Sequence, residues 1–162
     1  MGYRPLDVDL SGRVALVTGA NSGMGKETAR ELARMGAEVI LACRGQERGE
    51  AARNEIIATT GSTRVTVMPV DLSSLASVRA CAHAFQDRFP KLDVLVYNAA
   101  ASLRAREITP EGIERQWATN VLGPYLLGLE LPVQIAPMTA TASDLVMLAV
   151  LAANSAEARQ RA

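Results

Sequence analysis

The sequence predicts an α/β fold in which a doubly wound parallel sheet, the Rossmann arrangement, is covered by helices on both faces. Two observations lead to this prediction. Short apolar runs alternate along the chain with segments of helical periodicity, and the turns that lead from a strand into a helix are only a few residues long. Repeated right-handed crossovers of this kind join parallel strands. The 162 residues are expected to form one domain with about five strands.

The first strand leads into a glycine-rich turn. Val14 to Val17 is apolar and β-branched, helical periodicity begins at Ser22, and Gly36 stands at the usual left-handed cap position. Glycines let the main chain approach a pyrophosphate, and the start of a helix favours its negative charge. A dinucleotide site is therefore predicted at Gly19, Asn21, Ser22, Gly23, Met24 and Gly25. The alternative is a strand-turn-helix unit with a purely structural role.

Arg44 follows the second predicted strand, Ala37 to Cys43. In a doubly wound sheet this position lies beside the adenosine ribose, where an acidic residue would accept a hydrogen bond from a free 2′-hydroxyl. A guanidinium can instead pair with a 2′-phosphate, so the sequence favours NADP(H) over NAD(H). A solvated arginine is the alternative. Lys26 either adds positive potential near the phosphates or is a surface residue.

The remaining elements follow in the same alternating order. The pattern predicts a helix over 47–60 closed by a glycine, a strand over 64–70, a helix capped by Ser73 or Ser74 that extends to Phe89, a strand over 92–96, a long helix from Pro110, and a last strand over 144–152.

Composition argues against several functional classes. The 17 basic and 17 acidic residues balance, so nothing draws the chain to nucleic acid. The longest apolar run, Leu145 to Ala153, is too short to span a membrane, and the start lacks a signal-peptide core, so a cytoplasmic protein is expected. Cys43 and Cys81 are expected to be buried reduced thiols, the single His83 a helix-surface or packing residue, and no metal site is expected.

Two segments together resemble the short-chain dehydrogenase/reductase family. One is the glycine turn with Thr18 before it, and the other is Gln116 to Leu127, Gln-Trp-Ala-Thr-Asn-Val-Leu-Gly-Pro-Tyr-Leu-Leu. The resemblance covers about residues 12–131 and is greatest to the retinol dehydrogenase and WW-domain oxidoreductase branch. It implies an NADP(H)-dependent oxidoreductase that acts on an alcohol or carbonyl.

The resemblance also implies roles for single residues. Asp71, followed by Leu72, would hydrogen-bond the adenine amino group, with helix capping as its alternative role. Asn98 and Ala99 would form a turn that faces the cofactor, where Ala100 replaces the family's glycine. Asn120 would belong to a catalytic tetrad of Asn, Ser, Tyr and Lys, with a simple helix kink as the alternative.

The sequence departs from the family at the other tetrad positions. Lysine occurs only at 26 and 91 and tyrosine only at 3, 97 and 125, so no Tyr-x-x-x-Lys pair exists in these 162 residues. A tyrosine is a poor base at neutral pH unless a nearby cation stabilises its phenolate. Ala149 and Val150 stand where the family has Ser-Ser, within an atypical tail over about 133–162.

These departures predict a truncated or frame-shifted family member that is inactive as this chain. Its incomplete sheet would expose an apolar flank, which a second copy or a partner chain would cover. The alternatives are a non-catalytic dinucleotide-binding or interaction protein and a relic fragment.

Overall fold

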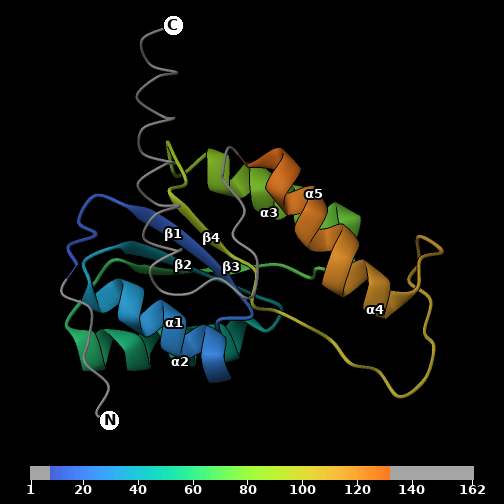
Figure 1. Ribbon diagram of the computed structural model, residues 1–162, viewed down its shortest axis with the longest axis horizontal. Helices are drawn as coiled ribbons and strands as arrows, with labels where there is room; N and C mark the ends of the chain where they lie inside the picture. Colours follow the sequence, from blue (N-terminus) through green and yellow to red (C-terminus); the bar gives the residue numbers. More distant parts are fainter. Residues whose placement is uncertain (1–7, 132–162) are drawn as a thin grey trace, which may run out of the picture.

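The computed structural model describes residues 8–131, which form one four-stranded parallel sheet with helices on both faces (Figure 1). The strand order is β3-β2-β1-β4. The strands are β1 (Val14–Thr18), β2 (Glu38–Cys43), β3 (Val65–Pro69) and β4 (Val94–Val96). The helices are α1 (Gly23–Arg34), α2 (Gln46–Thr60), α3 (Leu75–Gln86), α4 (Arg115–Trp117), the π-helical turn η1 (Ala118–Leu122) and α5 (Gly123–Glu130).

The sheet is buried on both faces. In Figure 1, α1 and α2 cover one face while α3 and α5 cover the other. Successive residues of β1 point to opposite sides, so Leu16 joins the core beneath α3 and α5 whereas Val17 joins the core beneath α1 and α2. This explains why β1 and β2 appear in the sequence as continuous apolar runs. The predicted α/β fold with a doubly wound parallel sheet is confirmed.

The strand order places a topological switch point between β1 and β4. The chain moves outward from β1 through β2 to β3 and then returns to pair β4 with the other side of β1, with Val17 opposite Val96. Doubly wound sheets bind ligands outside the carboxyl ends of the strands at such a point. The ends of β1 and β4 therefore define where a ligand is expected.

Most element boundaries agree with the sequence to within one or two residues, but the long helix begins later than predicted. It starts at Arg115 rather than near Pro110, because Ile108 and Glu114 form an isolated antiparallel bridge around a turn in which Gly112 has φ +79°. The Glu114 carboxylate then accepts hydrogen bonds from the N–H groups of Gln116 and Trp117. This side-chain cap fixes the start of the helix.

Smaller differences concern α3 and the last predicted strand. The helix ends at Gln86 instead of Phe89, although the Phe89 ring still packs on Phe85 with ring centroids 5.0 Å apart. Ser74, not Ser73, is its N-cap and accepts a hydrogen bond from the Ser77 N–H. The predicted strand over 144–152 lies outside the described residues.

The two cysteines are free and buried, as expected. Burial raises the pKa of the Cys81 thiol to about 11 and also raises the pKa of Cys43, so both stay protonated at neutral pH. His83 is exposed on α3.

Within residues 8–131, no helix is long and apolar enough to cross a membrane. The same residues contain no group of His, Cys, Asp and Glu side chains that could hold a metal ion.

Asp93 anchors the start of β4 to the start of β1. Its carboxylate, only 4% exposed, accepts hydrogen bonds from the Val14 N–H at 2.8 Å, from Arg13 Nη1 at 3.0 Å and from Lys91 Nζ at 3.2 Å. Burial alone would raise the pKa of this carboxyl, but the three hydrogen bonds hold it below its ordinary value. The ionised form therefore stabilises the fold.

Replacing Asp93 with asparagine should lower the free energy of unfolding at neutral pH by about 2 kcal/mol. Because the folded pKa is depressed, the carboxylate's contribution is complete above the unfolded pKa near 3.8 and is lost as pH falls through the folded pKa. Urea unfolding of both proteins at neutral and acidic pH measures this. The difference in free energy of unfolding between the wild type and Asp93→Asn should become smaller on acidification. A difference that does not change with pH would contradict the role of Asp93.

Candidate functional site

Thr18 joins the carboxyl ends of β1 and β4. Its side chain is buried, and its Oγ1 donates to the Val96 carbonyl at 3.3 Å. The same oxygen accepts from the N–H groups of Asn98 at 3.0 Å and Ala99 at 3.1 Å. A threonine at the end of a buried strand thus fixes the turn after β4 against the glycine turn. The sequence showed this threonine only as a feature of the family resemblance and gave no sign of this role.

Asn98 adds a second link between the two turns. Its Nδ2 donates to the carbonyls of Thr18 at 3.0 Å and Gly19 at 3.3 Å. The structure therefore brings the two predicted cofactor segments together at the switch point. The Asn98 amide nitrogen is already used within the protein, so this side chain holds the site in shape.

The predicted glycines of the turn have two different structural reasons. Gly19 has φ +67°, and a Cβ there would lie 2.9 Å from the Ala99 Cα. A Cβ on Gly25 would lie 2.6 Å from the Gly19 carbonyl oxygen and would overlap the Asn98 amide. Gly23 has φ +55° but open space around it. Gly19 and Gly25 allow close packing of the two turns, whereas Gly23 allows a left-handed backbone.

The start of α1 is suited to an anion. Ser22 is the N-cap residue, yet its side chain accepts no hydrogen bond from the helix, and the first turn contains no acidic residue. Ser22, Gly23 and Met24 are exposed, while Asn21 is half-buried. The N–H groups and the positive end of this 12-residue helix therefore face solvent beside the glycine turn.

Lys26 is a partly buried residue of α1 that forms an ion pair with another helix. Its Nζ lies 2.7 Å from the Glu55 carboxylate on α2, and Arg30 Nη2 contacts the same carboxylate at 2.6 Å. The hydrogen bond from Lys26 lowers the pKa of Glu55. Lys26 thus serves the contact between α1 and α2, and its charge is compensated there.

Arg44 stands exposed at the carboxyl end of β2, as the sequence predicted. Its guanidinium has no hydrogen bond or ion pair with any residue in the described range 8–131. The next residue, Gly45, is the N-cap of α2 and offers no side-chain acceptor. Within residues 8–131, no acidic side chain compensates the Arg44 charge.

Asp71 is held by the residues that follow it. Its Oδ1 accepts from both the N–H of Ser73 at 2.9 Å and the Ser73 hydroxyl at 2.7 Å, and its own N–H donates to Ser77 Oγ at 2.9 Å. The carboxylate thus stabilises the turn before α3, although the cap itself is Ser74. Leu72 is buried, and its carbonyl lies so close to Gly123 that a Cβ there would overlap it.

Asn120 lies in the π-helical turn η1, and its amide binds one backbone residue twice. Asn120 Oδ1 accepts from the Ala101 N–H at 2.7 Å, and Nδ2 donates to the Ala101 carbonyl at 2.8 Å. Asn120 therefore lies beside the segment that follows exposed Ala100. Tyr97 directly follows β4. Its hydroxyl is buried without a hydrogen-bond partner among residues 8–131, and burial raises the pKa of Tyr97 to about 12.

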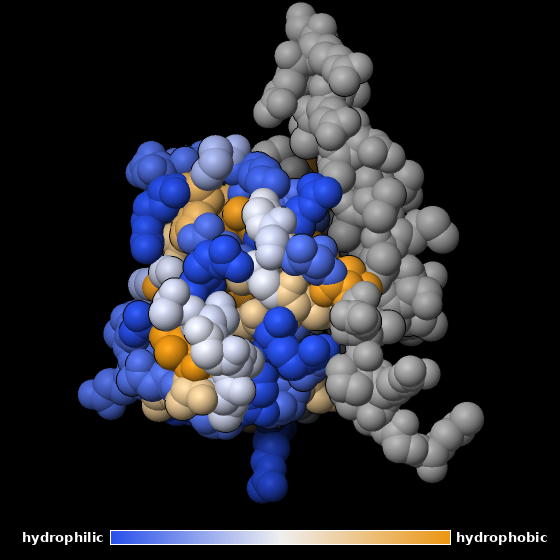
Figure 2. Space-filling model, turned by 90° about the vertical axis from the view of Figure 1, so that its left-hand side faces the viewer, coloured by the Kyte–Doolittle hydropathy of each residue, from blue (hydrophilic) through white to orange (hydrophobic). Residues whose placement is uncertain are grey.

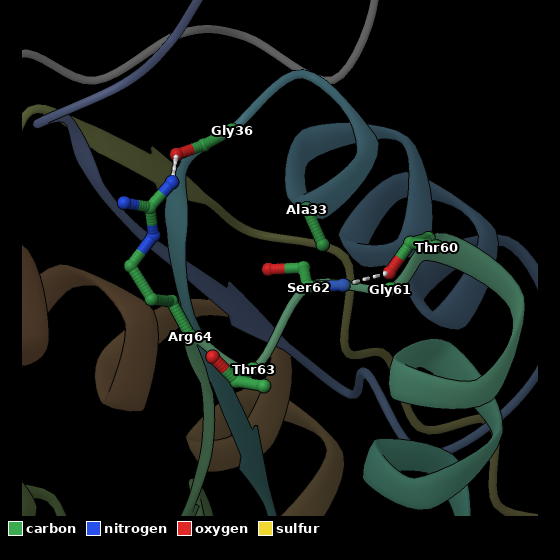
Figure 3. Close-up of a pocket in the computed structure, with 7 residues that line it drawn as sticks. All are labelled: Ala33, Gly36, Thr60, Gly61, Ser62, Thr63 and Arg64. Atoms are coloured by element: carbon green, nitrogen blue, oxygen red, sulfur yellow. Dashed lines mark hydrogen bonds between the residues drawn. The ribbon is translucent and has the colours of Figure 1, made fainter.

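A separate pocket of about 330 Å³ lies near the amino ends of β2 and β3 (Figure 3). It is lined by Ala33, Gly36 and residues 60–64, where α1 and α2 end. Arg64 Nη2 donates to the Gly36 carbonyl at 2.6 Å. The molecular side shown in Figure 2 carries mostly hydrophilic residues with small apolar groups among them. Because the pocket lies at the amino ends of the strands, it is not the predicted dinucleotide site.

A family model described as short chain dehydrogenase matches residues 13–153. Human dehydrogenase/reductase SDR family member 13 is 53% identical over 119 residues, which cover 74% of this chain and 31% of that protein. Bovine retinol dehydrogenase 12 is 47% identical over 121 residues, 75% of this chain and 38% of the relative. The chain thus spans about a third of the length of these curated relatives.

Solved structures agree with this assignment of the fold. An uncharacterised protein of Mycobacterium paratuberculosis superposes with a TM-score of 0.66 at 40% identity, covering 76% of this chain and 43% of that one. L-Sorbose reductase from Gluconobacter frateurii, solved with NADPH and L-sorbose, gives a TM-score of 0.64 at 28% identity, with 78% and 48% covered. The expected similarity to retinol dehydrogenases is confirmed at the level of sequence.

Proposed function

Because the chain belongs to the short-chain dehydrogenase family, we propose that residues 8–131 form the NADP(H)-binding half of an oxidoreductase acting on an alcohol or carbonyl. The observation that carries this proposal is the junction of β1 and β4, where Thr18 and Asn98 hold two turns together beside the open start of α1. This junction is the switch point at which doubly wound sheets bind dinucleotides.

Different residues of the chain would contact different parts of the dinucleotide. The pyrophosphate would lie against the glycine turn and the N–H groups at the start of α1. The adenosine end would extend over β2, where Arg44 would pair with the 2′-phosphate and Asp71 would reach the adenine. The nicotinamide end would then lie toward β4 and the turn 98–100. When bound, the nicotinamide supplies or accepts a hydride.

Proton transfer is the part of the reaction for which these residues offer no group. The only buried phenol in the described range with a raised pKa is Tyr97, and the residue four positions later is Ala101. No cation at that spacing can stabilise its phenolate. We therefore propose that these 162 residues bind the cofactor without turning over a substrate.

Mixing the purified 162-residue chain with NADPH and a panel of aldehydes and ketones tests this expectation. We expect no loss of NADPH absorbance above the rate without protein. Sustained, protein-dependent oxidation of NADPH would show that a different proton donor operates and would contradict the proposal.

The second candidate function is a non-catalytic dinucleotide-binding protein. It is favoured by the absence of the Tyr-x-x-x-Lys pair from the sequence together with the retained glycine turn. Both candidate functions include cofactor binding. They differ in whether the bound cofactor is used to reduce a carbonyl.

A further inference from the structure

The segment from Ala100 to Glu107 has no regular secondary structure, yet side chains of the long helix hold it at defined points. It is part of the yellow loop that leaves β4 and returns to α4 in Figure 1. Asn120 binds the backbone of Ala101 through both amide atoms. Gln116 Oε1 accepts from the Leu103 N–H at 2.9 Å.

The two amides can act together because they are four residues apart, which places them on one face of a helix. The helix is itself fixed to the far end of the loop, since the Arg115 N–H donates to the Glu107 carbonyl at 2.9 Å. Arg115 Nε also lies 3.1 Å from the Glu107 carboxylate. The loop is therefore tied to the helix near its start, in its middle and at its end.

We propose that Gln116 is a positioning residue that holds the turn after β4 in the shape that receives the nicotinamide half of NADP(H). This inference rests on the proposed function. Arg44, at the end of β2, marks the adenosine side of the switch point, so the end of β4 lies on the opposite, nicotinamide side. Leu103 is four residues beyond Ala99, and Thr18 fixes Ala99 from the other direction.

The geometry specifies which atom of Gln116 matters. Its Oε1 serves as an acceptor, and no hydrogen bond from its Nε2 to residues 8–131 accompanies that contact. Glutamate at this position keeps an acceptor oxygen. Methionine keeps the length of the side chain but has no oxygen to accept the hydrogen bond. Gln86 is a matched control, because its Nε2 donates to the Glu130 carbonyl at 2.8 Å where α3 meets the end of α5.

The test compares two ligands on the full 162-residue chain: NADPH, and adenosine 2′,5′-bisphosphate, which lacks the nicotinamide half. Gln116→Met should weaken NADPH binding about fivefold, the value of one neutral hydrogen bond, and leave the bisphosphate affinity unchanged. Gln116→Glu should bind both ligands as the wild type does, and so should Gln86→Met. In the ligand-free protein, Gln116→Met should also speed hydrogen exchange at the Leu103 amide.

The outcomes separate the two proposals. If the wild type binds both ligands and Gln116→Met weakens both equally or neither, the positioning role is wrong and the proposed function stands. If the wild type binds neither ligand, the proposed function is wrong and this inference falls with it. Unchanged exchange at Leu103 would also overturn the inference, because the hydrogen bond would then not hold the loop.

Discussion

Replacing Arg44 with aspartate should weaken NADPH binding about 30-fold or more and leave NADH binding equal or stronger. The 2′-phosphate of NADPH would lose its charge-assisted interaction with the guanidinium, which contributes about 1.5–3 kcal/mol, and the new carboxylate would repel that phosphate. Aspartate can also accept a hydrogen bond from the free 2′-hydroxyl of NADH. Fluorescence titration of both cofactors measures the change in preference.

The control for this substitution is Arg79→Asp. Arg79 is an exposed arginine on α3, which covers the opposite face of the sheet from α2. The same change of charge there should leave the preference for NADPH intact. If Arg44→Asp also preserved the preference, or if the wild type bound the two cofactors equally, the role proposed for Arg44 would be wrong.

Replacing Gly19 with alanine should abolish measurable NADPH binding and destabilise the fold. Two costs combine at this position. Alanine at φ +67° is strained by about 1 kcal/mol, and overpacking adds about 1–3 kcal/mol because the new Cβ would lie 2.9 Å from the Ala99 Cα. The two turns would have to separate, which displaces the backbone that would face the pyrophosphate.

Substitution of Gly61 distinguishes the cost of backbone strain from the cost of overpacking. Gly61 also has a positive φ, +72°, but a Cβ there meets no atom within 4 Å. Gly61→Ala should therefore lose only about 1 kcal/mol in urea unfolding and should bind NADPH as the wild type does. A similar loss of binding in both variants would mean that overall stability, and not the packing of the two turns, controls the site.

The sheet and its order of elements could be predicted because local and tertiary signals agree. The apolar β-branched run of β1, the change to helical periodicity in α1 and the glycine at 36 each specify the same structure. The end of α2 is another such case, since the helix was expected to be closed by Gly61, and this glycine is its C-cap in the left-handed conformation. Position 44 was identified by the same logic, because the end of β2 follows directly from the strand pattern.

Features that depend on contacts outside the regular strand and helix patterns could not be predicted. The helix after the loop begins at Arg115 because Glu114 caps it and pairs with Ile108, and propensity alone does not reveal that bridge. Lys26 has a partner on another helix, Glu55, that lies 29 positions away. The contact between Gln116 and Leu103 joins a helix to an irregular loop, for which no periodic pattern exists.

Direct titration of the wild-type 162-residue chain with NADPH and NADH tests whether the protein with its junction of β1 and β4 binds NADP(H). We predict saturable binding of NADPH that is tighter than binding of NADH. Absence of saturable binding of either cofactor to the folded protein would contradict this prediction.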